Sequence, residues 1–216
     1  MTPRWESVLF DLDGTLADTV PLILACYRHT MTVHRGAPLP DELWLRHVGR
    51  PLRDSMLDFG RDAAEADALR ETYIAFQREA HDRMVRPFPG IVEAVRELRD
   101  GGVPLGVVTS KTREMALRTL EVCGLGDAFP VVVTADEVTL GKPHPEPVHL
   151  ALRMLSVAPG RGSVFVGDSP HDLVSGRAAG VRTVGVTWGA ATADVLAAEA
   201  PDHLIRSVAE LRALRP

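Results

Sequence analysis

Short valine-rich runs alternate with amphipathic helical patterns along most of this 216-residue chain. The runs that we interpret as strands lie at residues 7–11, 103–110, 130–136, 163–169 and 182–188. They are brief and do not alternate strictly between apolar and polar residues, which is typical of strands that are covered on both faces. Because strands that alternate with helices favour a doubly wound parallel sheet, the sequence predicts an α/β core of Rossmann-like type.

The stretch between the first two of these runs breaks the alternation. It contains helical patterns only, at residues 20–35, 41–48, 51–59 and 62–83. We therefore predict an inserted all-helical domain over residues 17–84, and a core that consists of residues 1–16 and 85–216.

Small and rigid residues mark the two crossings between these predicted domains. Gly14-Thr15-Leu16 is the expected outgoing hinge, and Pro87 and Pro89 mark the expected return. Glycine allows the backbone to turn and proline fixes it, so both residue types suit a hinge.

Composition excludes several classes of function. A formal net charge of −5 disfavours general binding to nucleic acid or to an anionic membrane. Cys26 and Cys123 lie far apart within apolar helical patterns, and the eight histidines form no HxH or HExxH pair, so neither a thiol mechanism nor a zinc site is expected. No apolar run reaches 18 residues, so we expect a cytoplasmic protein without a leader peptide or a membrane span.

Acidic side chains follow two of the predicted strands. Asp11 and Asp13 follow the first run, and Asp168 follows the fourth, with Asp172 one helical turn further on. The carboxyl ends of parallel strands form the ligand-binding edge of such a sheet, so we expect these carboxylates to converge. Their mutual repulsion is costly without a cation, and a hard cation with oxygen ligands, Mg²⁺ above all, removes that cost. The alternative is a cluster of turn and helix-capping residues.

Three further polar residues are predicted at the same edge. Thr109 and Ser110 end the second run, and Lys142 follows the third run after a short loop, between Gly141 and Pro143. The alternatives are an ordinary β-branched strand end for Thr109 and a solvated surface residue for Lys142.

The order and spacing of these groups resemble the haloacid dehalogenase superfamily of phosphohydrolases. All four of its motifs are present: D-x-D-G-T from Asp11 to Thr15, the strand-end Thr109, Lys142, and G-D-x-x-x-D at residues 167–172. The helical insertion matches the first cap position of that superfamily. The stretches around the last three motifs look like those of phosphoglycolate phosphatases and, closer still, of bacterial inorganic pyrophosphatases.

The resemblance implies a role for each residue of these motifs. Asp11 would attack phosphorus and form an aspartyl phosphate, and Asp13 would protonate the leaving oxygen and then deprotonate the hydrolytic water. Mg²⁺ would be held by Asp11, the backbone carbonyl of Asp13 and Asp168, with Asp172 supporting the metal shell. The groups implied to hold the phosphoryl oxygens are Lys142, Thr109 and the backbone N–H groups near Gly14 and Ser110.

Two differences from other members of this superfamily narrow the range of reactions that we expect. The dehalogenases of this superfamily lack the second aspartate, so Asp13 favours phosphate chemistry. Its sugar phosphomutases carry a cap-hinge histidine about a dozen residues after the nucleophile, where this chain has Ile23, which disfavours a mutase without excluding one.

The loop at residues 46–54 is the expected source of substrate specificity. In the family that this chain resembles, a cap loop at this position reaches into the site. Arg50 is our candidate for binding a substrate carboxylate or a second phosphate, because a guanidinium pairs with either in a bidentate manner. A solvated basic loop is the alternative interpretation.

The resemblance implies a Mg²⁺-dependent phosphohydrolase for a small phosphorylated metabolite, with inorganic pyrophosphate or phosphoglycolate as the leading substrates. A phosphatase for a biosynthetic sugar phosphate or nucleotide is one alternative, and a catalytically silent binding protein on the same fold is the other. The expected partner is that small anion, with no nucleic acid and no membrane, and the expected assembly is a monomer or a homodimer.

Overall fold

A six-stranded parallel sheet lies at the centre of the computed structural model, which describes residues 5–214. In the order β5-β4-β1-β6-β7-β8, its strands are Val131–Val133, Leu105–Val108, Ser7–Phe10, Ser163–Gly167, Arg182–Val186 and His203–Ile205. The predicted α/β class with a doubly wound parallel sheet is confirmed. Residues 1–4 and 215–216 of the predicted core lie outside the described residues.

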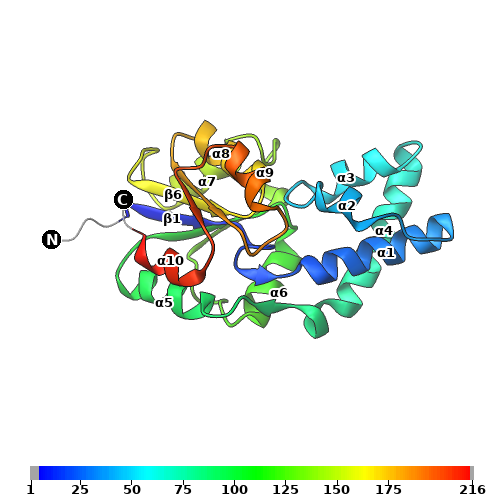
Figure 1. Ribbon diagram of the computed structural model, residues 1–216, viewed down its shortest axis with the longest axis horizontal. Coiled ribbons are helices and arrows are strands. Elements are labelled where there is room, and N and C mark those ends of the chain that lie inside the picture. Colours follow the sequence, from blue (N-terminus) through cyan, green and yellow to red (C-terminus); the bar gives the residue numbers. More distant parts are fainter. Residues whose placement is uncertain (1–4, 215–216) are drawn as a thin grey trace.

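Helices cover both faces of this sheet (Figure 1). One face carries α7 (Glu146–Met154), α8 (Pro170–Ala178) and α9 (Ala193–Ala198), and the other carries α5 (Ile91–Asp100), α6 (Arg113–Val122) and α10 (Val208–Ala213). In β1, Val8 and Phe10 belong to the apolar cluster that includes residues of α5 and α6, whereas Leu9 belongs to the cluster that includes residues of α7. Because both faces of the strand are buried, its sequence is apolar without alternation.

The strand order makes β1 the switch point of the sheet. The chain proceeds from β1 to β4 and β5 on one side, and then to β6, β7 and β8 on the other. Adjacent connections therefore diverge at the carboxyl end of β1, and a crevice opens where they part. Asp11 comes directly after this strand.

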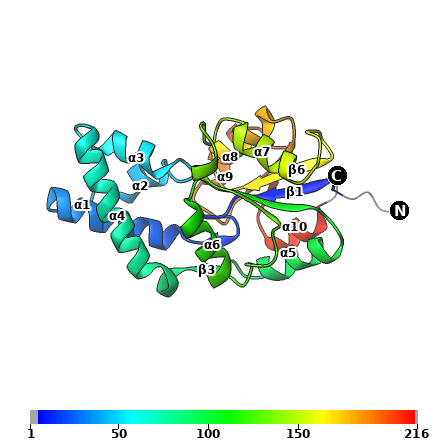
Figure 2. The same cartoon turned by 180° about the vertical axis from the view of Figure 1, so that it is seen from behind.

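The predicted helical insertion consists of four helices that pack on one another: α1 (Val20–Arg35), α2 (Asp41–Leu45), α3 (Leu52–Phe59) and α4 (Ala63–Met84). They lie at the carboxyl-terminal edge of the sheet, at the opposite end of the molecule from α5 and α10 (Figures 1 and 2). We refer to them as the cap. Within residues 5–214, no helix has both the length and the apolar character needed to cross a lipid bilayer.

Two short antiparallel strands, β2 (Ala17–Asp18) and β3 (Arg86–Pro87), connect the cap to the core. The N–H of Phe88 also donates to the carbonyl of Leu16 at 3.3 Å. The expected outgoing and return hinges thus lie side by side and are hydrogen-bonded to each other.

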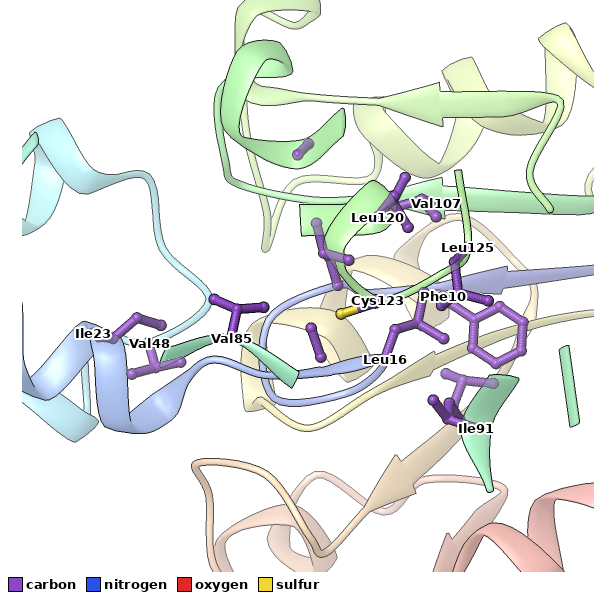
Figure 3. Packing of buried hydrophobic residues seen from close by; sticks show 14 of the residues in the cluster. Phe10, Leu16, Ile23, Val48, Val85, Ile91, Val107, Leu120, Cys123 and Leu125 are labelled. Carbon is purple, nitrogen blue, oxygen red and sulfur yellow. The ribbon is translucent and has the colours of Figure 1, made fainter. Parts of the chain in front are cut away.

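One apolar cluster continues through this connection. Ile23 and Val48 of the cap belong to the same cluster as Val85, Leu16 and Phe10, which lead into the core (Figure 3). The cap is therefore packed against the core through its own hydrophobic side chains and is not held by its two hinge segments alone.

Candidate active site

Asp11 lies directly beyond β1 at the switch point. Its backbone N–H donates to the carbonyl of Val166 in β6 at 2.8 Å, and its side chain is buried. The chain then turns at Gly14, whose φ of +79° lies in the left-handed region that favours glycine. A Cβ at this position would lie 2.1 Å from Oδ2 of Asp168, so the turn tolerates no side chain.

Lys142 reaches Asp11 from the loop after β5. Its Nζ donates to Oδ1 of Asp11 at 2.7 Å and to Oδ1 of Asp172 at 2.6 Å, and the residue is 3% exposed. The loop is held by Glu146, whose carboxylate accepts the N–H groups of Thr139 and Leu140 at 2.8 and 3.0 Å. Lys142 is therefore not the solvated surface lysine that the sequence left open.

Asp172 has two structural functions at the start of α8. Its Oδ1 accepts from Lys142, and its Oδ2 accepts from the backbone N–H and Oγ of Ser169 at 3.0 and 2.7 Å. The second contact is part of a capping box. The capping interpretation of Asp172 is thus correct, and the same carboxylate also orients Lys142.

Asp168 is fully buried and held from two sides. Oγ1 of Thr15 donates to its Oδ1 at 3.2 Å, and the N–H of Ala190 donates to its Oδ2 at 2.7 Å. Trp188 fixes Thr15 in turn, because its Nε1 donates to the Thr15 carbonyl at 3.1 Å. The orientation of Asp168 is therefore set by the outgoing hinge and by the segment after β7.

The buried carboxylates have the composition of a site for a hard cation. Asp11, Asp168 and Asp172 each place an oxygen within 4.8 Å of the others. Lys142 neutralises one of these three charges, which leaves a formal excess of two negative charges away from solvent. Such oxygen donors suit Mg²⁺, so the residues present fit a divalent metal. The side chain of Asp13 is not part of this group.

The pKa values of the buried carboxyl groups are raised mainly by burial, and the neighbouring negative charges add to this shift. Burial raises the pKa of Asp11 well above its usual value, and the attraction of Lys142 only partly opposes this. Burial and the neighbouring Asp172 raise the pKa of Asp168 to about 7. Burial alone would lower the pKa of Lys142, but the carboxylates of Asp11 and Asp172 raise it.

Lys111 is a site residue to which the sequence assigned no role. Its Nζ donates to Oδ1 of Asp13 at 2.6 Å, and its side chain is 7% exposed. Its backbone N–H donates to Oγ1 of the buried Thr109 at 3.2 Å. The only signal in the sequence was a lysine directly after the end of a predicted strand, which does not identify its partner.

The predicted cap loop lies against the core. The hydroxyl of Ser110 donates to the carbonyl of Gly49 at 2.6 Å, and a Cβ on Gly49 would lie 2.6 Å from Oγ of Ser169. Arg50 follows in this loop, but its Nη1 donates to Oδ2 of Asp58 at 2.7 Å and lies 3.0 Å from Nδ1 of His47. Much of its charge is therefore compensated within the cap.

A pocket of about 710 Å³ lies between cap and core. Predicted site residues that line it are Asp11, Asp13, Arg50, Thr109, Ser110 and Lys142. Asp168, Asp172 and Gly14 do not line it, and the N–H of Gly14 donates to the carbonyl of Ala17 at 2.9 Å. The N–H of Gly14 is thus used within a tight turn, and phosphate binding by N–H groups near Gly14 stays a prediction. The α4 residues Arg70, Tyr73 and Gln77 also line the pocket, and the sequence did not indicate them.

Comparisons with known proteins agree with this arrangement. A family profile described as haloacid dehalogenase-like hydrolase matches residues 8–186. A protein named pyrophosphatase PpaX from Bacillus velezensis is 38% identical over 208 residues, which cover 96% of this chain and 95% of that protein. A putative haloacid dehalogenase-like hydrolase from Bacteroides fragilis has a TM-score of 0.89 and 28% identity, covering 96% of this chain and all of its own. A predicted phosphoglycolate phosphatase from Haemophilus somnus shares the fold, with a TM-score of 0.86 and 22% identity over 96% of each chain.

Proposed function

Because this chain belongs to the haloacid dehalogenase-like hydrolase family, we propose that it is a Mg²⁺-dependent phosphohydrolase that acts through an aspartyl phosphate. The observation that carries the proposal is the buried cluster in which Lys142 contacts both Asp11 and Asp172, with Asp168 beside them. A cluster of this charge and composition suits phosphoryl transfer, where catalysis consists of positioning and of stabilising developing negative charge.

In the first half-reaction, a carboxylate oxygen of Asp11 attacks phosphorus and the bond to the leaving oxygen breaks. Asp13 gives its proton to that oxygen. Lys142, Thr109 and Ser110 line the pocket around Asp11. The ammonium group of Lys142, the hydroxyl of Thr109 and the backbone N–H of Ser110 donate to the phosphoryl oxygens. In the second half-reaction, Asp13 takes a proton from water, the water oxygen bonds to phosphorus, and the carboxylate of Asp11 is released with inorganic phosphate as product.

The metal site that we propose consists of Asp11, Asp168 and the backbone carbonyl of Asp13, with Asp172 in support. Mg²⁺ bound there would neutralise the repulsion between the Asp11 carboxylate and the substrate phosphate. The excess negative charge of the buried carboxylates supports this assignment.

Inorganic pyrophosphate and phosphoglycolate are the substrates that we place first. A relative that covers nearly the whole chain at 38% identity is named a pyrophosphatase, which supports pyrophosphate. The pocket of about 710 Å³ also has room for a larger sugar phosphate or nucleotide, which is the second candidate. We retain the cytoplasm as the proposed compartment and a monomer or homodimer as the proposed assembly.

The test is phosphate release by metal-stripped protein from pyrophosphate, phosphoglycolate and p-nitrophenyl phosphate, with and without added Mg²⁺. We expect release only with Mg²⁺, and none from Asp11→Asn at equal fold stability. Release that is independent of added Mg²⁺, or normal turnover by Asp11→Asn, would contradict the proposal.

A further inference from the structure

Four arginines of the cap line the pocket, and three of them have carboxylate partners. The pairs are Arg50 with Asp58 at 2.7 Å, Arg53 with Asp67 at 4.0 Å, and Arg78 with Glu114 at 2.7 Å. The fourth, Arg70 of α4, is half-buried and has no carboxylate within ion-pair distance among residues 5–214. The pocket therefore contains one arginine whose charge no acidic side chain of the described chain compensates.

Gln77 lies on the same helix and also lacks a partner. It is 7% exposed and lines the pocket, and its side-chain amide takes part in no hydrogen bond within the described part of the chain. Gln77 is not among the described residues whose polar side-chain atoms are sealed from solvent without a partner, so its amide is open to the pocket and free to bind an oxygen of a bound molecule.

Arg70, Tyr73 and Gln77 occupy one face of α4, because residues separated by three, four or seven positions lie on the same side of a helix. At 1.5 Å per residue, Arg70 and Gln77 are about 10 Å apart along the helix axis. Asp13, the proposed acid for the leaving group, lines the same pocket as this face.

We propose that Arg70 and Gln77 form the subsite for the leaving group of the substrate. This inference rests on the proposed phosphohydrolase function and extends it to a substrate class. Arg70 pairs with a carboxylate or phosphate at the far end of the leaving group, since its guanidinium presents two parallel N–H donors to an oxyanion. Gln77 donates to an oxygen between that end and the transferred phosphoryl group. The substrates are phosphate esters or anhydrides whose leaving group carries a second oxyanion.

The subsite replaces Arg50 as the main determinant of specificity. Arg50 already shares its charge with Asp58, so a substrate anion would have to compete with a carboxylate 2.7 Å away. A substrate anion that binds Arg70 would not have to compete with a carboxylate of the described chain.

The experiment compares Arg70→Ala, Arg70→Lys and Gln77→Glu with wild type on three substrates. Pyrophosphate and phosphoglycolate carry a second oxyanion, one a phosphate and the other a carboxylate, whereas p-nitrophenyl phosphate has none. Arg70→Ala should lower kcat/KM about 10- to 100-fold on the first two and less than about twofold on the third, the scale of a lost charge-assisted hydrogen bond. Arg70→Lys should restore part of the loss. Gln77→Glu keeps the shape but repels the oxyanion, so it should raise KM for the first two substrates.

Arg83→Ala is the matched control, since Arg83 is on the same helix, is exposed and does not line the pocket. It should leave all three activities unchanged. Equal losses by Arg70→Ala on all three substrates would indicate a structural role, and no loss on the oxyanion substrates would also overturn the subsite.

A wild type that hydrolyses none of the three substrates would contradict the substrates placed first in the proposed function, separately from the subsite. Calorimetry of phosphoglycolate binding to Asp11→Asn and to Asp11→Asn/Arg70→Ala then tests the subsite without turnover. Equal affinities would overturn it, and an affinity about tenfold weaker or more in the double variant would support it.

Discussion

At the scale of single residues, the site depends on charges that are buried together and compensated unequally. Lys142 lies between Asp11 and Asp172, and both contacts are shorter than 2.8 Å. Because Asp172 also caps α8, its carboxylate fixes the lysine to a helix that is packed against β6 and β7. We therefore expect Asp172 to position Lys142 and not to contact the substrate itself.

The substitution Asp172→Asn tests that positioning role. The amide keeps an acceptor for Lys142 but loses the charge that holds it, so kcat should fall about 10- to 100-fold, as for other residues that orient site groups. Steady-state kinetics with a Mg²⁺ titration measures the effect. An unchanged kcat and an unchanged Mg²⁺ requirement would show that Asp172 caps α8 but does not position Lys142.

Asp13 should serve as acid in one half-reaction and as base in the other. Asp13→Asn is expected to lower turnover about 10²- to 10⁴-fold on alkyl phosphates, the usual range for a positioned acid or base. The loss should be smaller for p-nitrophenyl phosphate, whose leaving group needs less protonation. Identical losses on both substrates would argue against the acid role.

We predict that Gly14 tolerates no side chain, because a Cβ there would collide with the carboxylate of Asp168. This collision adds to the backbone strain that any other residue would have at this φ. Gly36 provides the matched control, since its φ of +80° is equally unfavourable for alanine but a Cβ there meets nothing within 4 Å. Gly36→Ala should cost about 1 kcal/mol of stability and keep activity. Gly14→Ala should lose activity through the displaced Asp168 carboxylate. Similar activities of the two variants, measured beside thermal unfolding, would show that this contact is unimportant.

At the scale of secondary-structure elements, a buried polar contact joins the cap to the core. Nε2 of His81 in α4 lies 2.8 Å from Oγ1 of Thr119 in α6, and Nζ of Lys111 is 3.4 Å from the same hydroxyl. The hydrogen bonds thus lead from the last turns of α4 to Asp13 through Thr119 and Lys111.

This contact predicts a loss of stability at acidic pH. Burial lowers the pKa of the fully buried His81 below the usual 6.5, so the folded state favours the neutral ring. Below about pH 6.5 the unfolded chain takes up a proton that the folded chain resists, and the free energy of unfolding falls until the folded pKa is reached. Between pH 8 and pH 5 the raised pKa values of Asp168 and Asp11 act in the opposite direction, so the contribution of His81 is measured as the difference between the wild type and His81→Asn in denaturant unfolding. The wild type should lose stability relative to His81→Asn as the pH falls, and identical pH dependences of the two proteins would contradict the assignment.

The elements that the sequence predicted correctly are those with a clear physical signature. The valine-rich strands are buried on both faces, and the two long cap helices, α1 and α4, have 16 and 22 residues. We did not predict β8, which has three residues at the sheet edge, or α9, which has six. Such short elements are stabilised by neighbours that are distant in the sequence, as β8 is by β7.

The residues of the candidate site also fall into those that the sequence could predict and those that it could not. Asp11, Asp168 and Lys142 were predictable because they follow strands of one parallel sheet, whose carboxyl ends share an edge. The partner of Lys111 was not, because Asp13 is 98 positions away in the sequence and the contact depends on side-chain direction. Arg70 and Gln77 likewise became candidates only when the pairing of the other pocket arginines was known.

At the scale of the whole molecule, cap and core form one continuous apolar interior around a buried excess of negative charge. The cluster through Leu16 and Val85 joins the two parts, and the Gly49 loop contacts Ser110 above the carboxylates. A cation that binds this cluster therefore stabilises the folded state against unfolding.

Mg²⁺ should raise the Tm of the metal-stripped protein, and its removal by a chelator should reverse the rise. A free concentration about 100 times the Kd is expected to add about 2.7 kcal/mol to the free energy of unfolding. Differential scanning fluorimetry measures the shift, and Asp168→Asn should abolish most of it. A Tm that is independent of Mg²⁺ in the wild type would contradict the metal site.

The central claim is that Asp11 carries the phosphoryl group between the two half-reactions. The most direct measurement mixes the wild type and Mg²⁺ with excess substrate, quenches with acid within the first turnovers and maps the modified peptide by mass spectrometry. The account predicts one phosphoryl group on Asp11, and none in Asp11→Asn treated in the same way. A phosphoryl group on another residue, or turnover at the normal rate with no covalent intermediate at any quench time, would contradict it.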